Sequence, residues 1–331
     1  MIALKLPCTL ALSFLSIFLP ITLFANAAQE ANTTGSGDKA FRDGRQIMWQ
    51  EPRDIESRDL FYGIGGREGA PDPNGKFTFI KREGPPDDTS EKIVVRDERG
   101  RKWTVKFGPE AGAETAATRI IWAVGYHTDQ DYFVKRARIE GRGGFEVRNV
   151  RFERDDDGFK TTGRWDWNSN HFQNTRELQG LKVLMALINN WDLSSINNKI
   201  VQSENDPSKQ IYYVADLGAS LGTTGSFINR IPIYKDVAVP GSRGDAEAFA
   251  NHRFIEGVRE GEVIFHWNRS FGRDALRGVM VESARWMGDL LARLSDKQLS
   301  DAFRAGGFDD EDIAIYVRAI RERIRELQSL K

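Results

Sequence analysis

The chain contains almost no cysteine. Cys8 is the single cysteine among 331 residues, and it lies in a segment that we expect to be removed. No disulfide can therefore form within the chain, and its stability has to come from a packed core. A cysteine nucleophile and a cysteine-ligated zinc site are excluded for the same reason.

Histidine is scarce too, and neither sign of charge dominates. The four histidines show no zinc-binding spacing, and the serine-hydrolase pattern Gly-x-Ser-x-Gly does not occur. Lysine and arginine number 47 against 48 acidic residues, a net charge of −1. Without a basic excess, nucleic acid is not an expected partner.

The one long apolar run lies at the N-terminus. Lys5 is the only charge before residue 28, residues 10–24 are apolar apart from single small or polar residues and Pro20, and residues 25–27 read Ala-Asn-Ala. This order predicts a signal peptide over residues 1–27. The run is short for a membrane span of about 20 residues. We therefore expect cleavage after Ala27, export to the periplasm or the medium, and no stable membrane span afterwards.

The remaining chain predicts a mixed α+β protein with two lobes. Polar residues 28–54 are expected to form a flexible tether, residues 55–162 a small β-rich lobe with one helix, and residues 163–331 a larger, mainly helical lobe. β-Branched and aromatic residues or apolar periodicity define the elements. The expected strands are 77–83, 92–97, 102–107, 131–140 and 145–154; the expected helices are 109–125, 174–190, 273–294 and one that begins near 309.

The stretch from residue 189 to 222 is the most informative part of the chain. Two strand candidates, Asn198–Ser203 and Gln210–Ala215, flank the turn-forming residues 204–209. A hairpin centred on Asp206 and Pro207 would place Asn197 opposite Asp216 at its open end, where facing Cβ atoms lie roughly 5 Å apart.

Oxygen-bearing side chains at this place predict a cation site. A carboxylate from Asp216 and an amide oxygen from Asn197 suit a hard cation such as magnesium. Asp192 lies in the same loop and could accept the proton of a hydroxyl group. Two metal ligands together with such a base are typical of a phosphoryl-transfer site. Asn198 is the alternative ligand, although a regular strand would turn its side chain to the opposite face.

A second pair of charged residues lies upstream. Lys106 is on the polar face of its predicted strand, and Glu114 lies at the edge of the apolar face of the helix that follows. A carboxylate at the edge of a buried face needs a cationic partner, so we expect Lys106 to pair with Glu114. Glu110, one turn earlier, is the competing partner.

These motifs resemble those of protein kinases. The spacing from Asp192 to Asn197 is similar to that of the His-Arg-Asp-x-x-x-x-Asn catalytic loop, and Asp216-Leu217-Gly218 is similar to Asp-Phe-Gly. Asn190-Trp191 stands where ordinary eukaryotic-type kinases have His-Arg. The resemblance is therefore to the atypical kinase-like superfamily, which includes secretory-pathway kinases, lipid-kinase-like proteins and toxin-type serine kinases, and to a group of secreted bacterial proteins.

The resemblance implies a two-lobed, protein-kinase-like α+β fold and an ATP-dependent phosphotransferase. In it, Asp192 would be the base, Asn197 and Asp216 would hold Mg²⁺ or Mn²⁺, and Lys106 with Glu114 would position the phosphates of ATP. Thr89 and Ser90, in the loop between the first two strands, would contact the phosphates. The acceptor is a hydroxyl group on a protein, lipid, sugar or small molecule.

Two other functions fit the same residues. A catalytically inactive pseudokinase would keep nucleotide or partner binding without transfer. A metal-dependent hydrolase would use Asp192 and Asp216, but it lacks the histidine cluster that such sites commonly contain.

Overall fold

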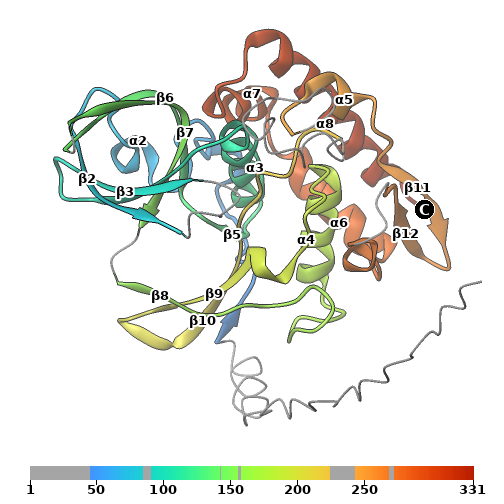
Figure 1. The fold of residues 1–331 in the computed structure, drawn as a ribbon. Helices are drawn as coiled ribbons and strands as arrows, with labels where there is room; N and C mark the ends of the chain where they lie inside the picture. Colours follow the sequence, from blue (N-terminus) through green and yellow to red (C-terminus); the bar gives the residue numbers. More distant parts are fainter. Residues whose placement is uncertain (1–44, 85–90, 142, 156–157, 224–242, 268–271) are drawn as a thin grey trace, which may run out of the picture.

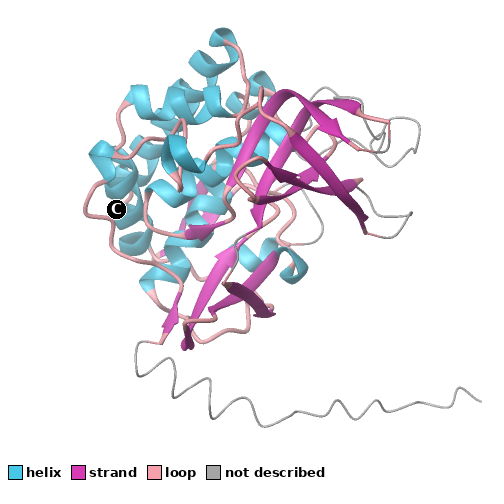
Figure 2. Cartoon of the chain, turned by 90° about the vertical axis from the view of Figure 1, so that its left-hand side faces the viewer, coloured by secondary structure: helices cyan, strands magenta, loops and turns pink. Residues whose placement is uncertain are grey.

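The computed structural model describes residues 45–331, apart from 85–90, 142, 156–157, 224–242 and 268–271. It combines a β-rich part with a group of helices, as Figure 1 and Figure 2 show, so the expected α+β class is confirmed. The predicted signal peptide, residues 1–27, lies outside the described residues and stays a prediction.

Five strands form a closed barrel in the order β2-β3-β4-β7-β6. Neighbouring strands are antiparallel except β2 and β6. Every second side chain points inward, and these positions carry the apolar residues that fill the barrel, among them Trp103, Val105 and Phe152. The strands are β2 (Phe77–Glu83), β3 (Lys92–Asp97), β4 (Lys102–Lys106), β6 (Asp131–Glu140) and β7 (Phe145–Asp155).

Helix α3 (Ala111–Ala123) lies between the barrel and the other helices (Figure 1). Its alanines and isoleucines belong to the large helical core and not to the core of the barrel. The helix passes very close to the end of α7 (Asp296–Ala305): a Cβ added at Gly112 would lie 2.5 Å from the carbonyl oxygen of Gly306. Small residues thus let α3 bridge the two parts of the fold.

A second sheet faces the lower end of the barrel in Figure 1. Its strand order is β1-β10-β9-β8, and β5 also pairs with β10. Its central hairpin consists of β9 and β10 and carries the stretch that the sequence singled out. The strands are β1 (Gln46–Ile47), β5 (His127–Thr128), β8 (Phe159–Gly163), β9 (Asn198–Ser203) and β10 (Asp206–Val214).

Two expected boundaries differ in the structure. Residues 45–54 were expected to be part of a flexible tether, but β1 pairs with β10 and Met48 is buried. The apolar side chains of Ile47 and Met48 explain this, because both can be buried once the strand has paired. The expected lobe boundary at Thr162 falls inside β8, which pairs with β9 of the second sheet.

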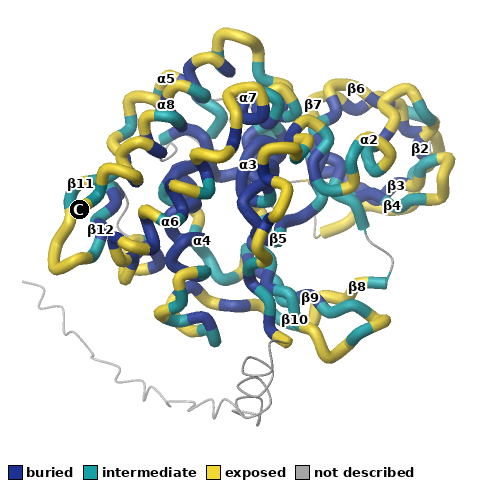
Figure 3. Tube along the Cα trace, turned by 180° about the vertical axis from the view of Figure 1, so that it is seen from behind, coloured by how far each residue is buried: buried dark blue, intermediate teal, exposed yellow. Residues whose placement is uncertain are grey.

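Helices form most of the remaining described elements. Figure 3 shows α4 as mostly buried, as its apolar sequence predicts, whereas α6 is buried on one face. The capping box predicted at Ser295 and Gln298 is present at the start of α7. The helices are α2 (Gly66–Gly69), α4 (Arg176–Leu187), α5 (Ala246–Ala250), α6 (Val281–Ala292) and α8 (Asp310–Ser329), with 3-10 turns at Ile55–Ser57, Ser195–Asn197 and Arg273–Leu276.

The helix expected over residues 273–294 is interrupted. It divides into the 3-10 turn and α6, separated by Gly278 in a left-handed conformation (φ 74°). Next to α6, a two-stranded sheet forms from β11 (Ile255–Arg259) and β12 (Glu262–Phe265). Within the described residues, no helix is both long enough and apolar enough to cross a membrane.

Candidate active site

Lys106 ends strand β4 on the outer face of the barrel. Only 7% of its side chain is exposed, and its Nζ lies within ion-pair distance of three carboxylates. Glu110 is 3.2 Å away, Glu114 3.6 Å and Asp216 2.8 Å. The structure therefore places Lys106, Glu114 and Asp216 in one cluster, although Asp216 is 110 residues from Lys106 along the chain.

Both candidate partners of Lys106 are used. Glu114 is fully buried on α3 and also contacts Arg151 of β7, while Glu110 lies just before α3 and also binds Arg243 at 3.0 Å. Choosing between the two carboxylates from the sequence was thus unnecessary, because one turn of helix presents both to the lysine.

Burial and opposite charges act against each other in this cluster. Burial by itself would lower the pKa of Lys106, but the carboxylates, with Glu114 foremost, raise it above its ordinary value. Burial raises the pKa of Glu114 to about 7, against the opposing effect of Arg151 and Lys106. Burial also works to raise the pKa of Asp216, yet Lys106 outweighs it and holds that pKa below the usual range. Lys106 therefore stays protonated and Asp216 ionised.

The Asp-Leu-Gly turn has the geometry of a constrained site. Asp216 adopts a left-handed conformation (φ 48°), which is uncommon for a residue other than glycine, and 48% of its side chain is exposed. Leu217 is fully buried and anchors the turn. A Cβ at Gly218 would lie 2.6 Å from the Cβ of Glu110, so the turn can approach α3 this closely only with glycine there.

The hairpin register differs by one residue from the expected one. Asn198 pairs with Val214, and the amide of Ala215 donates to the carbonyl of Asn197 at 2.9 Å. Asn197 therefore lies opposite Ala215 and not opposite Asp216. The turn is Glu204-Asn205 instead of residues 204–209, and a bulge between Asp206 and Gln210 shifts the pairing beyond it.

Asp192 and Asn197 are held in the same loop. The Nδ2 of Asn197 donates to the carbonyl oxygen of Asp192 at 3.1 Å, so the Oδ1 of Asn197 is the atom that could bind a cation. Asp192 is exposed, and its amide is fixed by the side chain of Asn190 at 2.8 Å. The loop thus holds its own backbone in place and leaves the Asp192 carboxylate accessible to a second substrate.

The structure describes Asn198, the alternative metal ligand, but not Thr89 and Ser90, the predicted phosphate contacts. Asn198 is buried and donates to the carbonyl oxygen of Trp165 at 3.2 Å, so it points into the protein, as expected for the residue next to Asn197. Thr89 and Ser90 lie outside the described residues, and their role stays a prediction.

The donor atoms fit a hard cation. Asp216 supplies an exposed carboxylate and Asn197 an amide oxygen, and both are ligand types that Mg²⁺ and Mn²⁺ accept. Among the described residues, no group of three or more His, Cys, Asp or Glu side chains forms a metal site. A cation at this place would therefore need further oxygens from a bound phosphate or from water.

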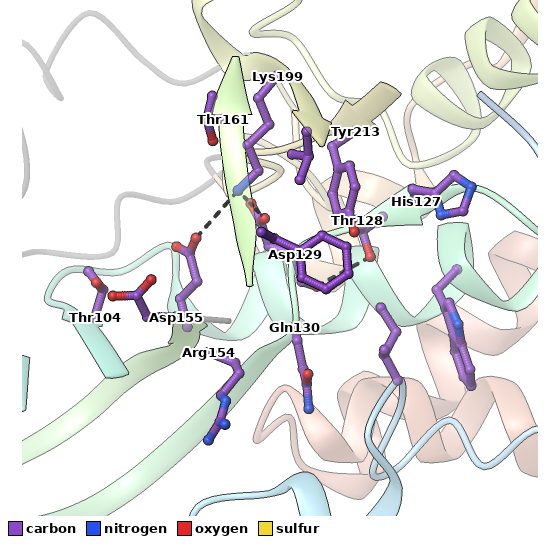
Figure 4. A pocket seen from close by; sticks show the side chains of 15 residues that line it. Thr104, His127, Thr128, Asp129, Gln130, Arg154, Asp155, Thr161, Lys199 and Tyr213 are labelled. Carbon is purple, nitrogen blue, oxygen red and sulfur yellow. Dashed lines mark hydrogen bonds and ion pairs between the residues drawn. The ribbon is translucent and has the colours of Figure 1, made fainter. Parts of the chain in front are cut away.

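A cavity of about 240 Å³, drawn in Figure 4, is lined in part by Glu153, which pairs with Arg151. Thr104 lies in its wall, two residues before Lys106 on the same face of β4, and Lys199 lies two residues after Asn197. Two residues of a strand span about 7 Å, so this wall of the cavity lies close to Lys106 along β4. The other lining residues are Ile64, Trp122, His127, Thr128, Asp129, Gln130, Arg154, Asp155, Phe159, Thr161, Val201 and Tyr213.

Sequence reasoning missed the second half of the ion cluster. Arg151 contacts Glu114, Asp131 and Glu153, and Lys199 contacts Asp129 and Glu153. The signal was the alternation along β7, where Arg151 and Glu153 occupy one face while Val150 and Phe152 occupy the other. Such charges on a strand normally indicate a solvent-facing side, and only the packing of α3 and β9 against this face reveals that it is buried.

Similarity to known proteins is found among solved structures. No protein-family model matches the sequence, and no curated protein matches it. The crystal structure of the Helicobacter pylori proinflammatory kinase CtkA is similar, with a TM-score of 0.43 and 13% sequence identity over 78% of this chain and 95% of that chain. A similarity at this level carries no argument about activity.

Proposed function

We propose that this protein is an ATP-dependent phosphotransferase that transfers the terminal phosphoryl group to a hydroxyl acceptor. The observation that carries the proposal is the meeting of Lys106, Glu114 and Asp216 beside the loop of Asp192 and Asn197. These are the residue types that phosphoryl transfer requires: a fixed cation for the phosphates, oxygen ligands for a metal, and an accessible base.

Each residue has a distinct part in the reaction. Lys106, held by Glu114, would bind the phosphates of the nucleotide, and its charge is secured by the raised pKa. Asp216 and Asn197 would hold Mg²⁺ or Mn²⁺, which when bound neutralises phosphate charge. Glu114 itself is too deeply buried to reach a substrate.

Asp192 would act on the acceptor. The hydroxyl oxygen forms a bond to the terminal phosphorus while its proton passes to the Asp192 carboxylate, and the bond to the bridging oxygen breaks to release ADP. The neighbouring cavity would take the nucleoside part, because it lies about 7 Å along the strands from Lys106. Its lining includes the aromatic rings of Tyr213 and Trp122.

Nucleotide binding is the first test. Wild-type protein should gain thermal stability from ATP with Mg²⁺, and Asp216→Ala should abolish the metal-dependent part of that gain. Lys106→Met should weaken ATP binding with or without metal. Asp206→Ala, an exposed carboxylate at the far end of the same hairpin, is the matched control. If the control and Asp216→Ala behave alike, Asp216 does not hold the metal.

A pseudokinase is the second candidate. The cluster of Lys106, Glu114 and Asp216 fits it as well, because nucleotide binding by these residues does not require transfer. In that case the wild type would bind ATP but transfer no phosphate to any acceptor, itself included.

A further inference from the structure

A chain of ion pairs connects the cavity to the phosphate-binding lysine. Starting in the cavity, Asp129 contacts Lys199, which lies 3.7 Å from Glu153; both contacts are drawn in Figure 4. Glu153 in turn binds Arg151 at 2.7 Å. The second half of the chain then follows from Arg151 to Glu114, from Glu114 to Lys106, and from Lys106 to Asp216. Acidic and basic side chains alternate through all of these members.

Two members of this chain, Lys199 and Asp216, belong to the β9–β10 segment. Lys199 is on β9, and Asp216 lies two residues beyond the end of β10. The middle of the chain belongs to the barrel and to α3, through Glu153, Arg151 and Glu114. The β9–β10 hairpin is therefore attached to the barrel at two points, one on each side of Asn197.

Lys199 is well suited to fix this spacing. Its ammonium group pairs with both Asp129 and Glu153, so two carboxylates from outside the hairpin hold it. Its Nζ lies over the ring of Tyr213, 5.7 Å from the ring centre. Since the pairs are largely buried, moving the hairpin away from the barrel would leave charges without partners, at considerable cost.

We propose that Lys199 is a positioning residue, which holds the metal-binding residues of the hairpin at a fixed distance from Lys106 through its ion pairs with the barrel. Lys199 itself need not touch the phosphates. This proposal rests on the proposed function for its consequence in catalysis, but the coupling between Lys199 and Lys106 is a property of the protein without ligands.

The first experiment measures nucleotide affinity. Lys199→Met removes the charge and keeps the stem, and we expect it to weaken the binding of ATP with Mg²⁺ by about tenfold. Lys199→Arg keeps the charge and should remain within about threefold of the wild type. The control is Lys209→Met on the same hairpin, where the lysine is exposed and pairs only with nearby Asp206; its affinity should not change.

The second experiment needs no nucleotide. Lys199→Met, Lys106→Met and the double variant are unfolded with urea, and their unfolding equilibrium constants are compared. Residues that share no partners give multiplicative effects. We expect the unfolding equilibrium constant of the double variant to be at least about threefold smaller than the product of the two single effects predicts. The reason is that both lysines belong to the same chain of ion pairs. A cycle of Lys209→Met with Lys106→Met should be multiplicative. If Lys199→Met does not fold, Asp129→Asn replaces it in both experiments.

The outcomes separate this proposal from the proposed function. If the wild type binds no ATP but the cycle is non-multiplicative, the phosphotransferase is wrong and the coupling stands. If the cycle is multiplicative, the positioning role is overturned, whether or not affinity falls; a fall would then mean direct contact with the nucleotide. If the cycle is non-multiplicative but Lys199→Met binds ATP as tightly as the wild type, Lys199 does not position the metal-binding residues.

Discussion

Around Lys106 and Arg151, the two faces of strands β4 and β7 are both buried, yet they have opposite chemistry. The inner face carries Trp103, Val105 and Phe152, which fill the barrel. The outer face carries Lys106 and Arg151, whose exposures of 6% and 4% are nearly as low. Adjacent residues of one strand therefore meet an apolar core on one side and an ion cluster on the other.

This contrast shows what each face contributes. Burying a large apolar side chain stabilises the fold by about 1.5–3 kcal/mol. Burying a charge costs desolvation energy that a counter-charge only offsets, so an ion cluster adds little net stability. The outer face is therefore best explained by what it can bind, and the inner face by what it stabilises.

The largest expected effect comes from removing the central cation of the outer face. Arg151→Met would leave Asp131 without its cation and Glu114 with Lys106 alone. We expect a loss of about 3–5 kcal/mol in the free energy of unfolding, measured in urea. Arg148→Met, an exposed arginine of the same strand, should change it by less than about 0.5 kcal/mol. A similar small loss for both variants would mean that the cluster is solvated.

A buried group without a counter-charge should respond to acid. Burial lowers the pKa of His127 from 6.5 to about 4, and its Nε2 has no hydrogen-bond partner among the described residues. The unfolded chain binds the proton first, because its histidine has the higher pKa. The stability that His127 contributes by staying neutral is therefore fully present above pH 6.5, and it is lost as the pH falls toward 4.

The expected loss from His127 is at most about 3 kcal/mol. It is measured by urea unfolding between pH 7 and 4, and His127→Gln should show a correspondingly smaller loss over this range. His266, which lies at an exposed ion pair with Glu256, provides the control through His266→Gln. An unchanged pH dependence in His127→Gln would contradict the burial of a neutral imidazole.

The inner face should affect stability without affecting binding. Val105→Ala removes two methyl groups from the barrel core next to Lys106, and we expect a loss of about 2 kcal/mol in the free energy of unfolding. The affinity for ATP with Mg²⁺, measured by calorimetry, should stay within about twofold, because the outer face keeps its charges. A large fall in affinity would show that the two faces do not act separately.

The smallest expected effect concerns the close approach of the Asp-Leu-Gly turn to α3. Gly218→Ala would place a methyl group 2.6 Å from the Cβ of Glu110, so that Glu110 has to move away from Lys106. We expect a loss of about 1 kcal/mol in stability and a several-fold loss of affinity for ATP. Gly257→Ala, which meets no atom within 4 Å, should alter neither. Equal effects of the two substitutions would mean that this approach is not important.

Local patterns predicted the elements well. The strands 77–83, 92–97 and 131–140 match the structure in full, because alternation and turn residues are encoded within each segment. The meeting of Lys106 with Glu114 was also predictable, since a strand and the next helix bring the two together.

The rest depended on contacts between distant segments. The pairing of β1 with β10 and of β8 with β9 could not be deduced from local sequence, and neither could the barrel closed by β2 and β6. The bulge after Asp206 shifted the hairpin register in a way that turn chemistry did not reveal. Arg151 and Lys199 looked like ordinary surface charges until their partners from other elements were known.

Phosphate transfer by the wild type and by Asp192→Asn tests the central claim most directly. The substitution keeps the size of the side chain and removes the charge that would accept the hydroxyl proton. We expect transfer from ATP to fall by about a hundredfold or more while the affinity for ATP with Mg²⁺ stays nearly the same. Transfer that does not depend on Asp192, or no transfer at all by a wild type that binds ATP, would contradict the assignment of this protein as a phosphotransferase.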